Sequence, residues 1–187
     1  VSDGYLRQLS LDGLGPTPTT GHGGRRSYSL AQINELRGYL ATARPREALE
    51  FLPRRRSGDK LQIITVANFK GGSAKTTTAL YLSQYLALAG FRVLAIDLDP
   101  QASLSAMFGY QPEFDIAENA TLYGAIRYDE HRRPMREVVR PTYFDGIGLV
   151  PGNLELMEFE HHTPRAMIER RERGHDLFFR RVASAID

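Results

Sequence analysis

Cysteine is absent from this sequence of 187 residues, which excludes disulfide bonds, iron–sulfur clusters held by thiolates and thiolate zinc sites. Long apolar runs are absent too, because stretches such as Val93 to Ile96 fall far short of the ~20 residues of a membrane helix. The first residues, Val1 to Tyr5, lack the basic and apolar segments of a signal peptide, and no initiator Met is present. A reducing, cytoplasmic setting is compatible with these absences.

Lysine is scarce, since 21 of the 24 basic residues are Arg. Arginine is the better bidentate partner of phosphate and of guanine edges, although the base composition of a genome can produce the same bias. The net charge of +2 hides an asymmetry, with +4 on residues 1–60 and −2 on residues 61–187. With 42% hydrophobic and 25% charged residues, the composition is that of a globular protein, and the length fits one domain and a smaller module.

A charged stretch punctuated by Pro and Gly, residues 53–60, predicts a linker between two regions. Before it, Ser2 is expected to cap a short helix, and the Gly-, Thr- and Pro-rich residues 13–24 predict a loop or wing. The SLAQ motif at 29–32 is a capping box for a second helix that ends near Ala43.

After the linker, residues 61–99 predict a right-handed βαβ unit. The β-branched run 61–68 is typical of a buried parallel strand, a helix is expected over 76–89, and a second strand over 92–97 ends in carboxylates. The remaining expectations are a short helix over 101–108, a loop over 110–122, helical pieces over 123–140 broken at Pro134, a third strand over 146–150 and a long charged helix over 163–185.

The residues between the first predicted strand and helix, KGGSAKTT at 70–77, have the composition of a phosphate-binding loop. Glycines let the backbone approach phosphates closely, and successive N–H groups and the helix N-terminus hold the negative charge. Lys75 would reach the β/γ-phosphates of ATP, and the Thr76 hydroxyl would be a ligand of Mg²⁺. The candidate nucleotide-binding residues are Gly71, Gly72, Ser73, Ala74, Lys75, Thr76 and Thr77. The alternative is a glycine turn followed by an incidental Lys-Thr pair.

This loop resembles the deviant Walker A motif, KGGxxKT, of the ParA/MinD ATPases. Ala74 stands where the general pattern G-x-x-x-x-G-K-[ST] has its last glycine, and Lys70 opens the loop. In that family the first lysine reaches across a nucleotide sandwich dimer, so the resemblance implies this role for Lys70, and a homodimer. A lysine that merely faces solvent is the alternative. The implied fold is an α/β P-loop NTPase with a parallel sheet and helices on both faces.

Two carboxylates, Asp97 and Asp99, follow the second predicted strand, at the edge where open α/β sheets bind ligands. The DxDPQ segment resembles that of ParA proteins, which implies that Asp99 positions or activates the attacking water and that Asp97 lies close to the Mg²⁺ shell. The catalytic candidates are Lys70, Lys75, Asp97 and Asp99, and the metal candidates are Thr76 and Asp97. The alternative is a pair of acids that cap the helix beginning near Gln101.

A hydrophobic strand ending in an acid, the Walker B strand of P-loop ATPases, is not visible after Val150. ParA relatives would continue into a strand of the form hhhhDCPP, so we expect this chain to be a piece that stops before that strand. Its later helices are then expected to expose apolar faces.

The first region resembles a MerR-like winged helix-turn-helix, in which a recognition helix precedes a wing with a G-x-R-x-Y motif and a further helix. The residues GRRSY at 24–28 fit that motif, and the first helix of the module would precede this chain. The DNA-binding candidates are Arg7 and Gln8 for base edges and Arg25 and Arg26 for phosphates. A small helical dimerisation module with a solvated basic face is the alternative.

Together, the front module and the KGGxxKT loop narrow the resemblance to the larger, RepA-like type of the ParA family. This implies a cytoplasmic, nucleoid-associated plasmid partition ATPase that uses ATP, ADP and Mg²⁺ and binds operator and nonspecific DNA but no membrane. It also implies a ParB-type partner (RepB) that stimulates slow hydrolysis, and repression of the protein's own operon. The implied domains are a partial winged helix-turn-helix at 1–52, a linker at 53–60 and the N-terminal part of the ATPase domain at 61–187.

Several rival interpretations remain. A nucleotide-responsive repressor in which hydrolysis is not essential is the main alternative. Nitrogenase iron proteins and anion-pump ATPases are disfavoured by the front module, and the iron protein also by the absence of cysteine.

The other polar and aromatic features have no assigned role. His161 and His162 are adjacent and point in different directions, so we expect a surface pair and not a metal site. The charges at 169–173 are typical of a solvated helix, with a partner contact as the alternative. Tyr110 and Phe114 either pack or line the adenine region.

Overall fold

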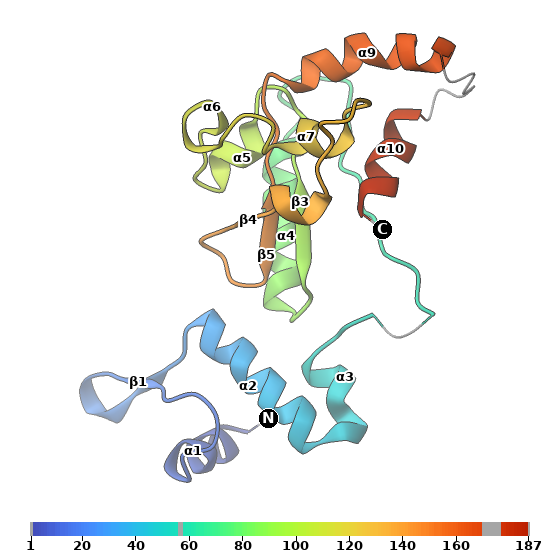
Figure 1. The fold of residues 1–187 in the computed structure, drawn as a ribbon. Coiled ribbons are helices and arrows are strands. Elements are labelled where there is room, and N and C mark those ends of the chain that lie inside the picture. Colours follow the sequence, from blue (N-terminus) through green and yellow to red (C-terminus); the bar gives the residue numbers. More distant parts are fainter. Residues whose placement is uncertain (1, 56–57, 170–176, 187) are drawn as a thin grey trace. The chain divides into compact units, whose positions relative to one another are not determined.

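A computed structural model describes residues 2–55, 58–169 and 177–186 and divides the chain into two compact units (Figure 1). The first unit runs to Thr65 and adds Gln84–Val93 and Phe144–Gly146, and the second consists of Val66–Ser83, Leu94–Tyr143 and the chain from Ile147. Helix α4 (Lys75–Leu88) and strand β3 (Val93–Ile96) therefore contribute residues to both units.

The first unit opens with helix α1 (Asp3–Leu11), and the Ser2 hydroxyl caps it as predicted, accepting a hydrogen bond from the Tyr5 N–H at 3.4 Å. An antiparallel ribbon follows, made of β1 (Thr19–Thr20) and β2 (Arg26–Ser27) and joined through the 3₁₀ turn η1 (His22–Gly24). This ribbon agrees with the loop or wing expected there.

Helix α2 (Leu30–Ala43) begins at the predicted capping box and ends where predicted. The Ser29 N–H donates to Gln32 Oε1 at 2.8 Å, and the Gln32 N–H donates to Ser29 Oγ at 3.2 Å. The short helices η2 (Pro45–Glu47) and α3 (Ala48–Phe51) follow.

Two hydrogen bonds connect α2 with later parts of the first unit, and a third, within α2, joins the two side chains that make them. Arg37 Nη2 donates to the carbonyl of Leu88 at 2.6 Å, and Arg37 Nη1 donates to Asn34 Oδ1 at 2.8 Å. The amide of Asn34 donates in turn to Asp145 Oδ2 at 2.6 Å. The C-terminal end of α4 is thus capped by a side chain of α2.

The sheet of the second unit is mixed, with strand order β3-β5-β4. Strand β3 runs parallel to β5 (Ile147–Val150), since the Asp97 N–H donates to the Val150 carbonyl at 3.0 Å and Val93 pairs in the same direction with Gly146. Strand β4 (Arg140–Pro141) is antiparallel to β5. The predicted parallel sheet is therefore confirmed for β3 and β5 and wrong for β4, because a two-residue edge strand that contains a proline gives almost no sequence signal.

The prediction of a strand over 61–68 is wrong, because this segment forms no strand in the part of the chain that the structure describes. A strand needs a neighbour for its backbone hydrogen bonds, and no described strand pairs with this segment. Its apolar side chains stay exposed, with Ile63 at 60% and Ile64 at 61%. The strands predicted over 92–97 and 146–150 are confirmed as β3 and β5.

The helices predicted around the sheet are confirmed in most cases. The helix over 76–89 is α4, that over 101–108 is α5 (Ser103–Met107), and the pieces over 123–140 are α7 (Leu122–Ile126) and α8 (Met135–Val138). The expected loop over 110–122 is wrong in part, because the single turn α6 (Pro112–Asp115) lies within it. The sequence feature that could have predicted α6 was Pro112, since proline suits the first position of a helix.

The long helix predicted over 163–185 corresponds to α9 (Leu156–Glu169) and α10 (Leu177–Ile186), and residues 170–176 lie outside the described residues. Helix α9 begins earlier than predicted and holds Pro164 in its interior, at a cost of about 3 kcal/mol. Burial of Leu156 and Phe159, at 3% and 0% exposure, favours the earlier start.

The core of the second unit lies where these helices meet the sheet. Phe159 stacks on Tyr128 with ring centroids 5.0 Å apart. The fully buried members of this core are Leu122, Ala125, Ile126, Val138, Val150 and Phe159. Within the described ranges, no helix has the length and apolar composition needed to cross a bilayer.

Candidate functional site

The glycine-rich loop at 70–74 forms a turn that leads directly into α4. Gly72 and Ala74 adopt left-handed backbone conformations with φ of +69° and +59°, and the Thr78 N–H donates to the Ala74 carbonyl at 2.9 Å. At its start, the Lys70 N–H donates to Asn68 Oδ1 at 2.9 Å. A methyl group added at Gly71 or Gly72 would meet no atom within 4 Å, so the space beside both glycines is open.

The polar groups of this turn suit an anionic ligand. Lys75 and Thr76 occupy the first turn of α4, where unpaired N–H groups give the helix end a partial positive charge. The Ser73 hydroxyl is buried, and no described residue forms a hydrogen bond with it. The Lys75 ammonium lies 3.5 Å from the Lys70 carbonyl, the limit of a hydrogen bond, which leaves its charge available to a phosphate. The loop therefore fits a nucleotide phosphate.

Asp97 lies at the end of β3 and is 3% exposed. Its Oδ2 accepts hydrogen bonds from the Ser105 N–H at 2.8 Å and the Ser105 hydroxyl at 2.7 Å, and its Oδ1 accepts one from the Asp99 N–H at 3.2 Å. Burial raises the pKa of Asp97 above 3.8, and the hydrogen bonds from Ser105 oppose that rise. Both oxygens thus already have partners in the protein, so Mg²⁺ contact by Asp97 stays a prediction.

Asp99 is exposed, and its Oδ1 accepts a hydrogen bond from the Gln101 N–H at 3.0 Å. Gln101 precedes α5, so this bond stabilises the turn before the helix and does not cap it. Asp97 accepts a hydrogen bond from the N–H of Ser105, the third residue of α5, but the N-cap residue of that helix is Ala102. Among the described residues, the other carboxylate oxygen of Asp99 accepts no hydrogen bond. Among the described residues, no hydrogen bond or ion pair joins the 70–77 loop to either carboxylate.

Three residues at this sheet edge were not singled out from the sequence: Ser105, Gly152 and Asn153. The Gly152 N–H donates to the Ser105 hydroxyl at 3.2 Å, so Ser105 connects the segments after β3 and β5. A methyl group at Gly152 would lie 2.8 Å from the carbonyls of both Asp97 and Asp99. The sequence could have pointed to Gly152, because it is a glycine two residues after a predicted strand. No sequence feature pointed to Ser105.

The DNA-binding candidates lie on exposed positions of the first unit. Arg7 and Gln8 are on α1, where the Gln8 amide donates to Asp12 Oδ1 at 2.7 Å. Arg25 and Arg26 lie at the end of η1 and the start of β2. All four side chains are exposed, and the Gln8 amide would have to leave Asp12 Oδ1 to donate to a partner.

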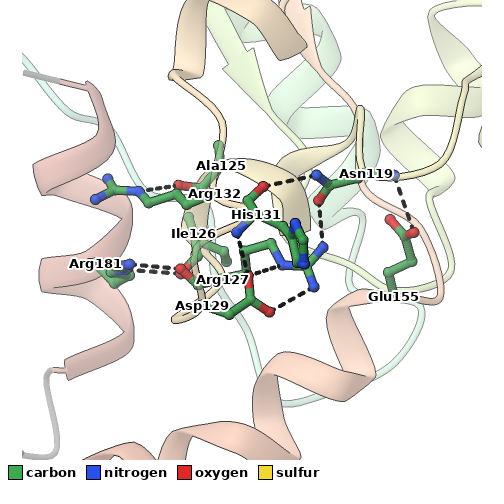
Figure 2. Close-up of polar contacts among 9 residues, drawn as sticks. All are labelled: Asn119, Ala125, Ile126, Arg127, Asp129, His131, Arg132, Glu155 and Arg181. Carbon is green, nitrogen blue, oxygen red and sulfur yellow. Dashed lines mark hydrogen bonds and ion pairs between the residues drawn. The ribbon is translucent and has the colours of Figure 1, made fainter.

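A polar network surrounds α7 in the second unit (Figure 2). Arg181 donates from Nε to the Ile126 carbonyl at 2.9 Å and from Nη2 to the Arg127 carbonyl at 2.6 Å. Arg132 Nε donates to the Ala125 carbonyl at 2.9 Å, so the C-terminal carbonyls of α7 are paired by guanidinium groups from other segments. These donors complement the negative end of the helix dipole.

Arg127 holds the loop after α7 in place. It forms an ion pair with Asp129 at 2.7 Å and donates to Asn119 Oδ1 at 2.8 Å. The guanidinium of Arg127 lowers the pKa of Asp129, and the Asp129 carboxylate accepts a further bond from the His131 N–H. This network serves the packing of α7 and α10, not the candidate nucleotide loop.

Comparison with known families gives a match over residues 61–183 to the family described as AAA domain. The chain belongs to this AAA-domain family. The match covers the phosphate loop, both carboxylates and the mixed sheet, so the AAA-domain region has an α/β fold of the P-loop NTPase type.

The AAA-domain chain also has similar relatives. It is 53% identical over 186 residues to "Putative replication protein A" of Sinorhizobium fredii, covering 100% of this chain and 45% of the relative. It is 32% identical over 165 residues to Protein SopA of Escherichia coli, covering 86% of this chain and 40% of SopA. It is 35% identical over 122 residues to the chromosome-partitioning ATPase Soj of Thermus thermophilus, covering 63% of this chain and 44% of Soj.

These relatives confirm the resemblance drawn from the motifs: the chain is a RepA-like member of the ParA family. It spans about half the length of the curated relatives it matches. Among solved structures, cobyrinic acid a,c-diamide synthase from Mycobacterium smegmatis with a bound ATP analog and magnesium is 32% identical, with a TM-score of 0.45 over 51% of this chain and 36% of that one.

Proposed function

We propose that the full-length protein is a plasmid partition ATPase that binds and slowly hydrolyses ATP and thereby controls its dimerisation, its DNA binding and plasmid segregation. The observation that carries this proposal is the 70–77 turn, whose left-handed backbone at Gly72 and Ala74 leads into the first turn of α4. The similarity to partition ATPases such as Soj supports the choice among ATPase functions.

The proposed roles of the residues follow from position and charge. The N–H groups of 71–77 and the Lys75 ammonium hold the phosphates, and Thr76 and Asp97 are the residues that would hold Mg²⁺, which supplies charge neutralisation at the phosphates when bound. Asp99 orients the attacking water through its exposed carboxylate. Lys70 reaches the nucleotide of a second copy of the chain in a dimer.

The front module is proposed to bind operator DNA, with Arg7 and Gln8 at base edges and Arg25 and Arg26 at phosphates. Its ribbon and exposed arginines support this role. In the same proposal, a ParB-type protein stimulates hydrolysis, and the ADP form represses the operon.

Hydrolysis of ATP by the full-length protein, with and without nonspecific DNA, tests the nucleotide site. We expect slow, DNA-stimulated turnover that Lys75→Ala abolishes, and weak or no turnover by residues 1–187 alone. Lys60→Ala is the matched control, because Lys60 is an exposed lysine outside the loop. Equal turnover in the Lys75 and Lys60 variants would contradict the assignment.

Operator binding across a range of salt concentrations tests the wing. Replacing both Arg25 and Arg26 by Ala is expected to weaken binding and to lower the salt slope by about one for each lost phosphate contact. Arg46→Ala, at an exposed arginine of η2, is the control. If the salt dependence of operator binding were unchanged, the assignment of Arg25 and Arg26 as phosphate contacts would be wrong.

A nucleotide-responsive repressor is the second candidate, favoured by the bond of Asp99 Oδ1 to its own loop. The two functions differ in the outcome of Asp99→Ala. Repression survives in both cases, but plasmid stability collapses only if the protein is a partition ATPase.

A further inference from the structure

Asn153 follows β5 at the carboxyl edge of the sheet and is 6% exposed. Its side-chain oxygen is buried and has no hydrogen-bond partner among the described residues. Such an atom costs about 1–3 kcal/mol, and buried polar atoms are rarely left without a partner. A partner supplied by another state of the protein would account for it.

The position of Asn153 identifies the segment that can supply this partner. The preceding residue, Gly152, lies so close to the 97–99 backbone that a methyl group there would be 2.8 Å from the carbonyls of Asp97 and Asp99. The Gly152 N–H also bonds to Ser105, which holds Asp97. Asn153 is therefore next to the segment that carries the proposed water-orienting carboxylate.

The missing partner must be a donor, because the unpaired atom is a carbonyl-type oxygen. Phosphates offer only acceptors, and the oxygen of Asn153 is closed to solvent, so neither the nucleotide phosphates nor bulk water fits. The backbone N–H groups of residues 98, 99 and 101 are donors of the required kind, whereas Pro100 has none.

One of these donors, the Gln101 N–H, already forms a hydrogen bond with the Asp99 carboxylate. Asp99 Oδ1 accepts the Gln101 N–H at 3.0 Å, which ties the carboxylate to its own loop. If Asp99 turns toward an attacking water, the Gln101 N–H loses that acceptor and needs another. The oxygen of Asn153 is an unused acceptor next to this segment, and a bond to it would keep the number of hydrogen bonds the same.

We propose that Asn153 is a positioning residue of the hydrolytic site, which accepts the Gln101 N–H in the nucleotide-bound state and so frees the Asp99 carboxylate. This inference rests on the proposed ATPase function. It deepens that function by naming the two hydrogen-bonding states of the 97–101 segment.

The test compares Asn153→Leu with the wild type in the full-length protein. Leu has the branching and the number of heavy atoms of Asn but cannot accept a hydrogen bond, so we expect kcat to fall about tenfold or more, through misplacement of Asp99. The affinity for a non-hydrolysable ATP analogue is expected to stay within twofold. Thermal stability without nucleotide is expected to be unchanged or higher, because an unpaired buried oxygen is removed.

Two further variants and one local readout sharpen this test. Asn153→Ser keeps an acceptor and is expected to retain more kcat than Asn153→Ala, which is nearly the same size. Tyr123→Phe removes a buried hydroxyl in the α7 core and is expected to leave kcat unchanged. Hydrogen exchange at the Gln101 N–H is expected to remain slow in the wild type with the ATP analogue and to become faster in Asn153→Leu.

The possible failures are distinguishable. A kcat of Asn153→Leu equal to that of the wild type, or a parallel loss of kcat, analogue affinity and stability, would overturn the role of Asn153 while Lys75-dependent hydrolysis upheld the ATPase. Absence of Lys75-dependent hydrolysis in the wild type would overturn the proposed function and this inference together.

Discussion

Replacing Gly152 by Ala is expected to destabilise the second unit by about 2–3 kcal/mol, the upper part of the range for overpacked cores. The added methyl carbon would lie 2.8 Å from two backbone carbonyl oxygens, whereas ordinary contacts begin at 3.4 Å. Neither side can yield easily, because the Asp97 N–H bonds to Val150 and the Gly152 N–H bonds to Ser105. The φ of Gly152 is not in the left-handed region, so the effect is one of space alone.

Urea denaturation followed by circular dichroism measures this loss, and hydrogen exchange of residues 97–108 shows where it acts. Gly38→Ala is the matched control, since a methyl group in the middle of α2 would meet no atom within 4 Å. That variant is expected to gain about 0.5–1 kcal/mol, because alanine is favoured over glycine within a helix. The packing argument is refuted if Gly152→Ala changes stability by less than about 0.5 kcal/mol and leaves exchange at 97–108 as in the wild type.

Three further predictions concern the phosphate loop, the buried carboxylate and the last helix. Ala74→Gly is expected to raise stability by about 1 kcal/mol in urea denaturation, because it relieves a left-handed backbone, whereas Ala79→Gly inside α4 should lower it by a similar amount. Equal effects of the two changes would count against the backbone conformation at Ala74. Ser105→Ala is expected to raise the pKa of Asp97 further, since Ser105 bonds lower it. A folded pKa above 3.8 favours the protonated carboxyl, so this stability is fully present below pH 3.8 and is lost as the pH rises through the folded pKa. The variant should therefore lose more stability than the wild type between pH 4 and pH 7, and parallel pH profiles would contradict this. Arg181→Met is expected to cost about 1–3 kcal/mol, through loss of two bonds from a charged donor, and to speed proteolysis near α10; unaltered cleavage would argue against the contact.

Local signals in the sequence were sufficient for most elements near the site. The capping box at 29–32 and the periodicity of α4 each depend on interactions within a few residues, and both helices were found where predicted. The loop composition likewise predicted the turn before Lys75, with Ala74 in the conformation that a glycine would favour.

Elements that depend on distant partners were not predictable in this way. The apolar pattern of 61–68 is suited to a strand, but a strand exists only where a neighbour accepts its hydrogen bonds. The start of α9 is decided by burial of Phe159 in a core built from five elements, not by the proline at 164. At the site, the partners of Asp97 come from Ser105 and Asp99, and only the three-dimensional structure shows that its oxygens are already occupied.

The hydrogen bonds from Arg181 to the carbonyls at the C-terminal end of α7 have a consequence for the order in which the chain folds during synthesis. A helix of five residues is too short to persist alone, and its last carbonyls find donors 55 and 54 residues further along, at Arg181. At about 5–20 residues per second, a ribosome needs roughly 3–10 s to add those residues. Throughout that interval the carbonyls of Ile126 and Arg127 lack the donors of Arg181, and only Arg132 can pair with the Ala125 carbonyl. The α7 segment should therefore be open to chaperones and proteases until α10 has left the exit tunnel.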